Sequence, residues 1–287
     1  MRIKTYRTHF IQELLPIYDV LEAESFFYLI LEEKHHLKQI HLALNPDLEL
    51  NESDVEVWEN LLKELKKEIP IQYLLGKTHF FGLDFEVNSN VLIPRPETEE
   101  LVQWIIDTVN KEFPSDKKIN ILDIGTGSGC IAVSLAKNIP NAKVFALDVS
   151  NEALKTAKNN ARCNGVKIQF LHKNILETTC FQEEFDIIVS NPPYVRNLEK
   201  AEIKNNVLQH EPHLALFVDD SDALIFYEKI SQLAENNLTE KGKLFFEINQ
   251  YLGNEMVDLL QNKKFKNIEL KKDIYENNRM IACEVIK

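Results

Sequence analysis

Long apolar runs and paired cysteines are both missing from this sequence. No apolar stretch among the 287 residues reaches the roughly eighteen that a membrane span needs, and the opening MRIKTYRTHF lacks the apolar segment of a signal peptide. The four cysteines, Cys130, Cys163, Cys180 and Cys283, are scattered without a CxxC pair. The cysteine pattern argues against a zinc site or a disulfide framework and favours a protein of the reducing cytoplasm. The lack of long apolar runs predicts no membrane role.

An excess of basic residues is missing as well, since the formal net charge is −12. A protein that binds nucleic acid tightly usually has a basic face, because neutralised phosphates supply most of the affinity. Residues 1–76 are the most acidic part, with 8 Lys and Arg against 14 Asp and Glu. We therefore expect no direct nucleic-acid partner, and a polycationic protein fits this surface better.

The length suits one large domain and a smaller one. Residues 1–76 repeat apolar positions at helical spacing, which predicts a small helical bundle. Its clearest helix spans about Ser53 to Lys67, with Ser53 and Glu56 at capping-box spacing. The apolar stripe of that helix is Val57, Leu61, Leu62 and Leu65.

Residues 77–95 are predicted to form a linking β-hairpin, because apolar runs flank the polar turn Asn88-Ser89-Asn90. Pro94-Arg95-Pro96 then stiffens the chain, since each proline fixes its own φ and restricts the preceding residue. Pro96 suits the first position of a helix whose first turn is acidic.

Residues 96–287 alternate between strands and helices, which predicts an open α/β sheet of the Rossmann-like kind with helices on both faces. The last two of its seven strands follow one another without a helix, so the final strand is predicted to be antiparallel. The predicted strands are Ile119–Ile124, Lys143–Leu147, Lys167–Leu171, Phe185–Ser190, Lys243–Ile248, Phe265–Leu270 and Met280–Ile286.

A glycine-rich loop follows the first predicted strand and opens a helix. Its residues are Asp123, Ile124, Gly125, Thr126, Gly127, Ser128 and Gly129. Glycines let the backbone turn sharply and approach a ligand closely. The spacing is G-x-G-x-G, whereas dinucleotide enzymes use G-x-G-x-x-G, and the alternative is a loop that only needs tight turns.

Two polar residues follow the next strands. Asp148 ends the second strand, where a carboxylate can accept both hydroxyls of a ribose, and capping of the helix near Ser150 is an alternative role. Asn174, after the third strand, falls where a side chain that contacts adenine would lie. Together these residues indicate a nucleoside ligand.

The tetrapeptide Asn191-Pro192-Pro193-Tyr194 follows the fourth strand, at the sheet edge where ligands bind. An amide or aromatic amino nitrogen is a poor nucleophile because its lone pair is delocalised. The Asn191 side-chain oxygen and the Pro192 carbonyl can accept its N–H groups, and two prolines keep that carbonyl aimed. Tyr194 offers a flat face for the planar group. The alternative is that the prolines simply end a strand.

The chain resembles the PrmC or HemK family of protein-(glutamine-N5) methyltransferases over nearly its whole length. The resemblance rests on IPRPETEELV, DIGTGSGCIA, ALDVS, SNPPYV, EPHLAL and DIYENNRM. It implies a class I methyltransferase fold, the cofactor S-adenosyl-L-methionine, and transfer to the glutamine of the Gly-Gly-Gln motif in class I peptide-chain release factors.

By the same resemblance, the tetrapeptide Asn191–Tyr194 holds the glutamine. The residues that it implies contact the cofactor are Asp123, Gly125, Thr126, Gly127, Ser128, Gly129, Asp148, Asn174, Ile175 and Asn191. Two positions depart from the family pattern: Asn174 stands where an aspartate is common, and the turn Tyr275–Asn278 has no glycine.

Three other functions compete with this one. An adenine-N6 methyltransferase of DNA or RNA shares NPPY but predicts a basic recognition region. A non-catalytic adaptor for a release factor or ribosomal partner predicts a damaged loop or tetrapeptide, and both are intact. A nicotinamide dehydrogenase is disfavoured by the glycine spacing.

Overall fold

The structure is a computed structural model that describes residues 1–263 and 265–287. These residues form two compact units. The first unit combines Met1–Gly76 with Lys204–His210, and the second combines Lys77–Ile203 with Glu211–Lys287. Nothing in the sequence predicted that Lys204–His210 joins the first unit. Within the described ranges, no helix has both the length and the apolar character that crossing a membrane requires.

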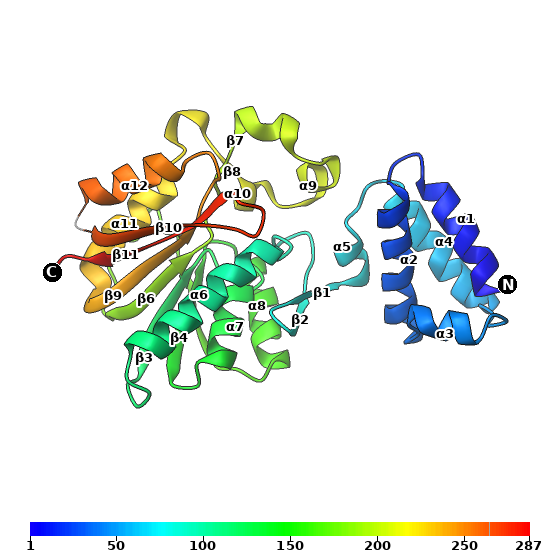
Figure 1. Cartoon of the computed structure of the whole chain (residues 1–287), viewed down its shortest axis with the longest axis horizontal. Helices are drawn as coiled ribbons and strands as arrows, with labels where there is room; N and C mark the ends of the chain where they lie inside the picture. The colour runs from blue at the N-terminus through cyan, green and yellow to red at the C-terminus, as the bar shows by residue number, and fades with distance from the viewer. Residues whose placement is uncertain (264) are drawn as a thin grey trace. The chain divides into compact units, whose positions relative to one another are not determined.

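The first unit is helical, as predicted (Figure 1). Its helices are α1 (Ile3–Leu14), α2 (Val20–His35), α3 (Gln39–Leu44), α4 (Glu52–Leu65), α5 (Ile71–Leu75) and α9 (Asn205–His210). Aromatic side chains fill its core: the Trp58 ring lies 4.8 Å from that of Phe27 and 5.6 Å from that of Phe10, centroid to centroid. The core is therefore held by apolar and aromatic packing.

The start of α4 differs from the predicted one. Asn51 caps the helix by accepting from the Asp54 backbone N–H at 2.8 Å, and the Asp54 carboxylate accepts from the Asn51 N–H at 3.3 Å. The capping box therefore lies two residues before the predicted Ser53 and Glu56. Val57 of the predicted stripe is 44% exposed, whereas Trp58 is fully buried, because tertiary packing decides which face turns inward.

A hairpin forms in the linking segment, but its turn was placed wrongly. Strands β1 (Lys77–Phe80) and β2 (Leu83–Glu86) pair through a turn at Phe81-Gly82, where both residues have positive φ. Asn88 to Val91 form a separate turn, closed by a bond from the Val91 N–H to the Asn88 carbonyl oxygen. The sequence pattern favoured the polar triplet, whereas Phe81 gains a bond from its N–H to the Glu99 carboxylate at 2.8 Å.

The second unit contains a seven-stranded sheet in the order β10-β11-β9-β6-β3-β4-β5. The strands are β3 (Ile119–Ile124), β4 (Ala142–Asp148), β5 (Ile168–His172), β6 (Phe185–Ser190), β9 (Leu238–Glu247), β10 (Phe265–Lys272) and β11 (Asn278–Val285). The first five are parallel, and β11 is antiparallel to both β9 and β10. This topology confirms the predicted fold class.

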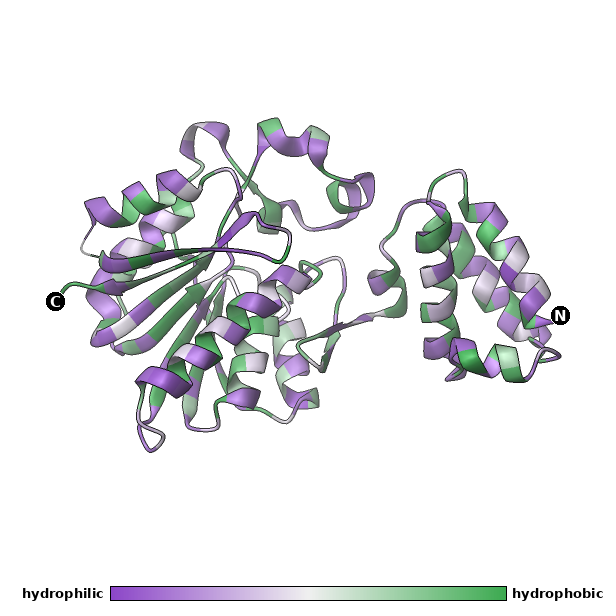
Figure 2. Cartoon of the chain, in the orientation of Figure 1, coloured by the Kyte–Doolittle hydropathy of each residue, from purple (hydrophilic) through white to green (hydrophobic). Residues whose placement is uncertain are grey.

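Helices cover both faces of this sheet, as Figure 1 shows. One layer holds α6 (Pro96–Glu112), α7 (Cys130–Asn138) and α8 (Asn151–Cys163), and the other holds α11 (Ile225–Asn237) and α12 (Gly253–Asn262). Pro96 is the first residue of α6, as predicted. The central strands are mostly hydrophobic and the helices are mixed (Figure 2), because strands covered on both faces have no solvated side.

Short elements follow β6 and were not predicted. They are β7 (Val195–Arg196), η1 (Asn197–Glu202), α10 (His213–Leu216), β8 (Phe217–Val218) and η2 (Asp220–Asp222), and β7 pairs with β8 in parallel. The turn before β11 has Glu276 at φ 65°, in the left-handed region that glycine adopts most easily. The buried Asp273 carboxylate holds this turn by accepting from the N–H groups of Tyr275 and Asn277.

Candidate functional site

A cavity of about 250 Å³ opens at the carboxyl ends of the parallel strands. Its walls come from the loops after β3, β4, β5 and β6, from residues 89–92 and from α10. Eight of the predicted site residues line it together: Gly125, Gly127, Asp148, Asn174, Ile175, Asn191, Pro192 and Pro193. A wider hollow of about 520 Å³ lies along α6, β9, β10 and β11, and within the described residues its lining includes none of the predicted site residues.

The glycine loop leaves open space on the cavity side. Gly125 and Gly127 have φ of 73° and 55°, and a Cβ atom added to either would meet no protein atom within 4 Å. Gly129 differs, because an added Cβ would lie 3.1 Å from the Cβ of Ala157 in α8. The first two glycines therefore shape a surface for a ligand, and the third allows close helix packing.

The other predicted residues of this loop are not among those lining the cavity. Asp123 is fully buried and accepts from the Thr126 hydroxyl at 2.6 Å, while the Ser128 carbonyl accepts from the Asn160 amide at 2.8 Å. Burial raises the pKa of Asp123 to about 7. These contacts hold the loop in shape from behind.

Asp148 ends β4 and lies under the same loop. One carboxylate oxygen accepts from the Gly127 N–H and the other from the Ser150 N–H, both at 2.8 Å. Burial raises the pKa of the Asp148 carboxyl despite these bonds. The cap of α8 is the Ser150 hydroxyl, which accepts from the Ala153 N–H, so Asp148 ties the glycine loop to the start of α8.

Asn174 and Ile175 form the cavity wall after β5. The Asn174 oxygen accepts from the Leu176 N–H at 3.0 Å, and its amide nitrogen donates to Glu177 at 2.9 Å. These bonds fix the orientation of the Asn174 side chain and stabilise the turn after β5. Ile175 is 7% exposed and adds an apolar surface.

Three of the four residues of the tetrapeptide after β6 line the cavity, and Tyr194 is partly buried against the neighbouring hydrophobic core. Asn191, Pro192 and Pro193 line the cavity, whereas Tyr194 is not among the lining residues. The Tyr194 hydroxyl donates to the Glu247 carboxylate at 3.1 Å, and burial raises the pKa of Tyr194 well above its usual range. The Asn191 amide nitrogen donates to the Thr98 hydroxyl oxygen at 3.3 Å.

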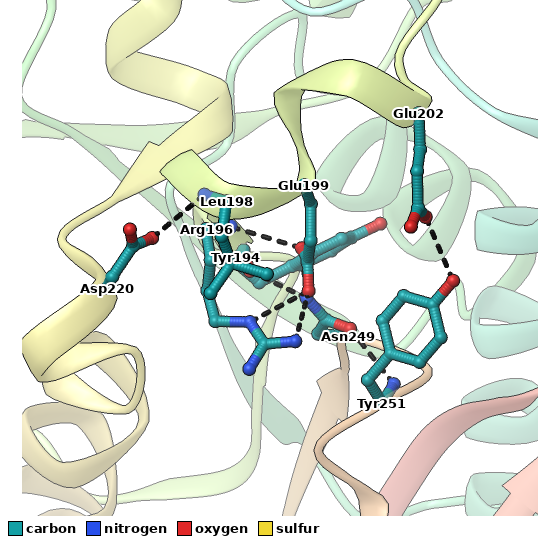
Figure 3. Close-up of polar contacts among 8 residues, drawn as sticks. All are labelled: Tyr194, Arg196, Leu198, Glu199, Glu202, Asp220, Asn249 and Tyr251. Atoms are coloured by element: carbon teal, nitrogen blue, oxygen red, sulfur yellow. Dashed lines mark hydrogen bonds and ion pairs between the residues drawn. The ribbon is translucent and has the colours of Figure 1, made fainter.

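A second polar network holds the chain just after Tyr194 (Figure 3). The amide of Asn249, which follows β9, donates to the Tyr194 carbonyl at 3.0 Å and to Glu199 at 2.9 Å. Arg196 donates to the same Glu199 carboxylate, through Nε at 2.8 Å. The end of β9 therefore holds the tetrapeptide from the side away from the cavity.

Residues missed by the sequence reasoning also converge on the site. Arg95 forms an ion pair of 2.6 Å with Glu211, which is 3% exposed and also accepts from the Ile93 N–H at 3.3 Å. Glu211 begins EPHLAL, and Pro212, Leu214 and Ala215 of that motif line the cavity. The sequence signal for these residues was only that both segments belong to the motifs of the resemblance, IPRPETEELV and EPHLAL.

The fold and the site together define a class I methyltransferase that carries the tetrapeptide of amino methyltransferases. The sheet is parallel except for β11, the glycine loop follows β3, the acid ends β4, and NPPY follows β6. A family model for the PrmC N-terminal domain matches residues 9–76, and one for the methyltransferase small domain matches residues 104–215.

The relatives agree with these domain matches. The release factor glutamine methyltransferase of Flavobacterium psychrophilum is 62% identical, covering 98% of each chain. That of Bacteroides thetaiotaomicron is 41% identical over 95% of this chain and 96% of its own. A solved methyltransferase from Pyrococcus furiosus, 18% identical with a TM-score of 0.52, shares the fold over 77% of this chain and 98% of its own. The chain belongs to the release factor glutamine methyltransferase family, which confirms the predicted resemblance.

Proposed function

We propose that this chain transfers a methyl group from S-adenosyl-L-methionine to the side-chain amide nitrogen of the glutamine in the Gly-Gly-Gln motif of class I peptide-chain release factors. One observation carries the proposal: the acceptors of NPPY line the same cavity as the glycine loop and the acid at the end of β4. The names of the relatives support the release factor as substrate.

The cavity fits the cofactor. Gly125 and Gly127 leave room that side chains would fill, Asp148 provides a carboxylate for ribose hydroxyls, and Asn174 with Ile175 forms a wall suited to adenine. When bound, the cofactor supplies a methyl group on a positively charged sulfur. The bonds from the N–H groups of Gly127 and Ser150 fix the Asp148 carboxylate before any ligand arrives.

The substrate amide is activated by position. The Asn191 side-chain oxygen and the Pro192 carbonyl accept its two N–H groups, and the ring of Tyr194 provides a flat face for the amide plane. These acceptors favour the positive charge that grows on the nitrogen during attack. A general base is not required, because the proton becomes acidic once the nitrogen is positive, so positioning is the main catalytic term.

The three parts of the chain have different roles in this proposal. Residues 1–76 dock the folded release factor, residues 77–95 link, and residues 96–287 carry the chemistry. The acidity of residues 1–76 suits a basic protein that works on ribosomes in the cytoplasm.

Mass spectrometry of a purified release factor tests the proposal. After incubation with this protein and the cofactor, the Gly-Gly-Gln peptide should carry one added methyl group on the glutamine. A factor with asparagine in place of that glutamine, and the Asn191→Ala variant, are the matched controls. Methylation of adenine in DNA or RNA, with the release factor unchanged, would instead support the nucleic-acid alternative. Binding of the release factor without methyl transfer would support the adaptor.

A further inference from the structure

Glu247 is a buried carboxylate that the proposed chemistry does not use. It is 1% exposed at the end of β9 and is not among the residues lining the cavity. One of its oxygens accepts from the Thr98 hydroxyl at 2.6 Å, and the other accepts from the Tyr194 hydroxyl at 3.1 Å. A carboxylate in such surroundings costs stability unless it is well bonded. Its position beside NPPY therefore points to a role in the site.

Thr98 connects this carboxylate to Asn191. Thr98 lies in the first turn of α6, is 2% exposed, and its oxygen receives the Asn191 amide N–H at 3.3 Å. A hydroxyl has one proton to donate, and an ionised carboxylate can only accept. Because Thr98 gives its proton to Glu247, it can only accept from Asn191. The amide nitrogen of Asn191 must then face Thr98, which leaves the side-chain oxygen as the acceptor for substrate.

We propose, resting on the function proposed above, that Glu247 is a positioning residue that sets the direction of the Asn191 amide through the Thr98 hydroxyl. The same carboxylate holds the far end of the tetrapeptide through the Tyr194 hydroxyl. Asn249, two residues further on, holds the Tyr194 backbone carbonyl (Figure 3). The end of β9 thus fixes both ends of NPPY, which keeps the two acceptors aimed at the substrate amide.

The charges around Glu247 are compatible with this role. Burial raises the pKa of the Glu247 carboxyl, the bond from Thr98 and the positive charge of Arg279 lower it, and Glu97 raises it. The two hydroxyl donors and Arg279 are therefore the groups that favour the ionised form against this burial. In the ionised form both carboxylate oxygens accept, which gives the chain of bonds its direction. If the carboxylate only stabilised the packing, it would not matter whether the Thr98 hydroxyl proton pointed to Glu247 or to Asn191.

Three variants of the full-length protein separate these roles. Thr98→Val keeps the shape of the side chain and removes its hydroxyl, whereas Thr98→Ser keeps the hydroxyl. Glu247→Gln supplies an amide that can donate to Thr98, so that the threonine proton can turn toward Asn191. We expect Thr98→Val and Glu247→Gln to lower kcat on the whole release factor about tenfold or more, the scale of one lost hydrogen bond at a reacting group. KM, melting temperature and calorimetric affinity for the cofactor should stay near wild type, and Thr98→Ser should restore kcat.

A spectroscopic readout stands independently of activity. The two side-chain amide proton signals of Asn191, identified by their loss in Asn191→Ala, should move in Thr98→Val and return in Thr98→Ser, with no substrate present. The inference is overturned if Thr98→Val turns over like wild type, or if its kcat, cofactor affinity and melting temperature fall together and serine does not restore them. If wild type fails to methylate any release factor, the proposed function fails, and the Asn191 signals alone decide the inference.

Discussion

The two units of this chain differ in what they bury. The core of the first unit consists of apolar and aromatic residues such as Phe10, Phe27 and Trp58. Within the described residues, and leaving tyrosine aside, every buried polar or charged side chain belongs to the second unit, including Asp123, Asp148 and Glu247.

Burial of a carboxylate costs stability, and bonds around it only partly offset that cost. In the second unit these carboxylates lie under the glycine loop, at the cavity and behind NPPY. The comparison indicates that the second unit accepts unfavourable burial in order to hold its site in place, whereas the core of the first unit needs no buried carboxylate.

The largest effect is expected in the first unit. Phe27→Ala removes a fully buried ring that packs against Trp58, so we expect the unit to lose about 3–5 kcal/mol of unfolding free energy. The two tryptophans lie one in each unit, so Trp58 fluorescence in a Trp104→Phe background reports the first unit. Leu21→Ala on the same helix, 76% exposed, is the control and should change stability by under about 0.5 kcal/mol. Equal losses in the two variants would contradict the packing argument.

Asn191→Ala tests the site of the second unit. We expect a loss of turnover on the order of a hundredfold or more, because one preorganised acceptor at the developing charge is removed. Cofactor affinity and melting temperature should change little, and Asn236→Ala, an exposed residue of α11, should behave like wild type. Steady-state methylation of the release factor measures the effect, and unchanged turnover would refute the assigned role.

Asp148→Ala addresses the cofactor wall. Loss of a charged acceptor should weaken S-adenosyl-L-methionine binding by roughly 1–3 kcal/mol, as measured by calorimetric titration. Asp107→Ala, an exposed acid of α6, is the control for charge alone. If the wild-type protein bound NAD in preference to S-adenosyl-L-methionine, the assignment of the cavity as a site for S-adenosyl-L-methionine would be wrong.

A comparison of substrates tests whether the first unit also takes part in recognition. A short Gly-Gly-Gln peptide should be at least about tenfold poorer in kcat/KM than the intact factor, because contacts far from the glutamine help to position it. Rising salt should reduce this advantage if the acidic surface contributes. Equal methylation of peptide and factor would leave the first unit with a stabilising role only.

The last effect is spread over several pH units and is small for each unit. Burial raises the pKa of Asp123 to about 7 from an ordinary 3.8. Between these values the folded protein keeps a proton that the unfolded chain has lost, so stability of the second unit falls as pH rises through this window. The expected slope is on the order of 1 kcal/mol per pH unit. Chemical unfolding followed by Trp104 in a Trp58→Phe background should show a flatter slope for Asp123→Asn. The pKa values of Asp148 and Glu247 are also raised, so part of the slope should remain in Asp123→Asn.

The sequence alone determined the α/β class, the seven strands with an antiparallel last one and the helical first unit. It also determined eight of the residues that line the cavity. These features depend on local patterns, since periodicity, a glycine loop and a proline pair have their meaning within a few residues. The turn at Phe81-Gly82 and the cap at Asn51 were missed because a polar triplet and a nearby serine fit the same local rules.

Only the tertiary structure decided how distant residues meet. Thr98 and Glu247 are 149 positions apart in sequence, and Arg95 and Glu211 are 116 apart, yet each pair shares a hydrogen bond of 2.6 Å. No periodicity encodes such a contact, because it depends on which strands become neighbours and on where α6 begins above them. The direction in which Asn191 presents its amide follows from these long-range bonds. The tetrapeptide NPPY is therefore recognised from four adjacent residues, but residues far from it in sequence orient its acceptors.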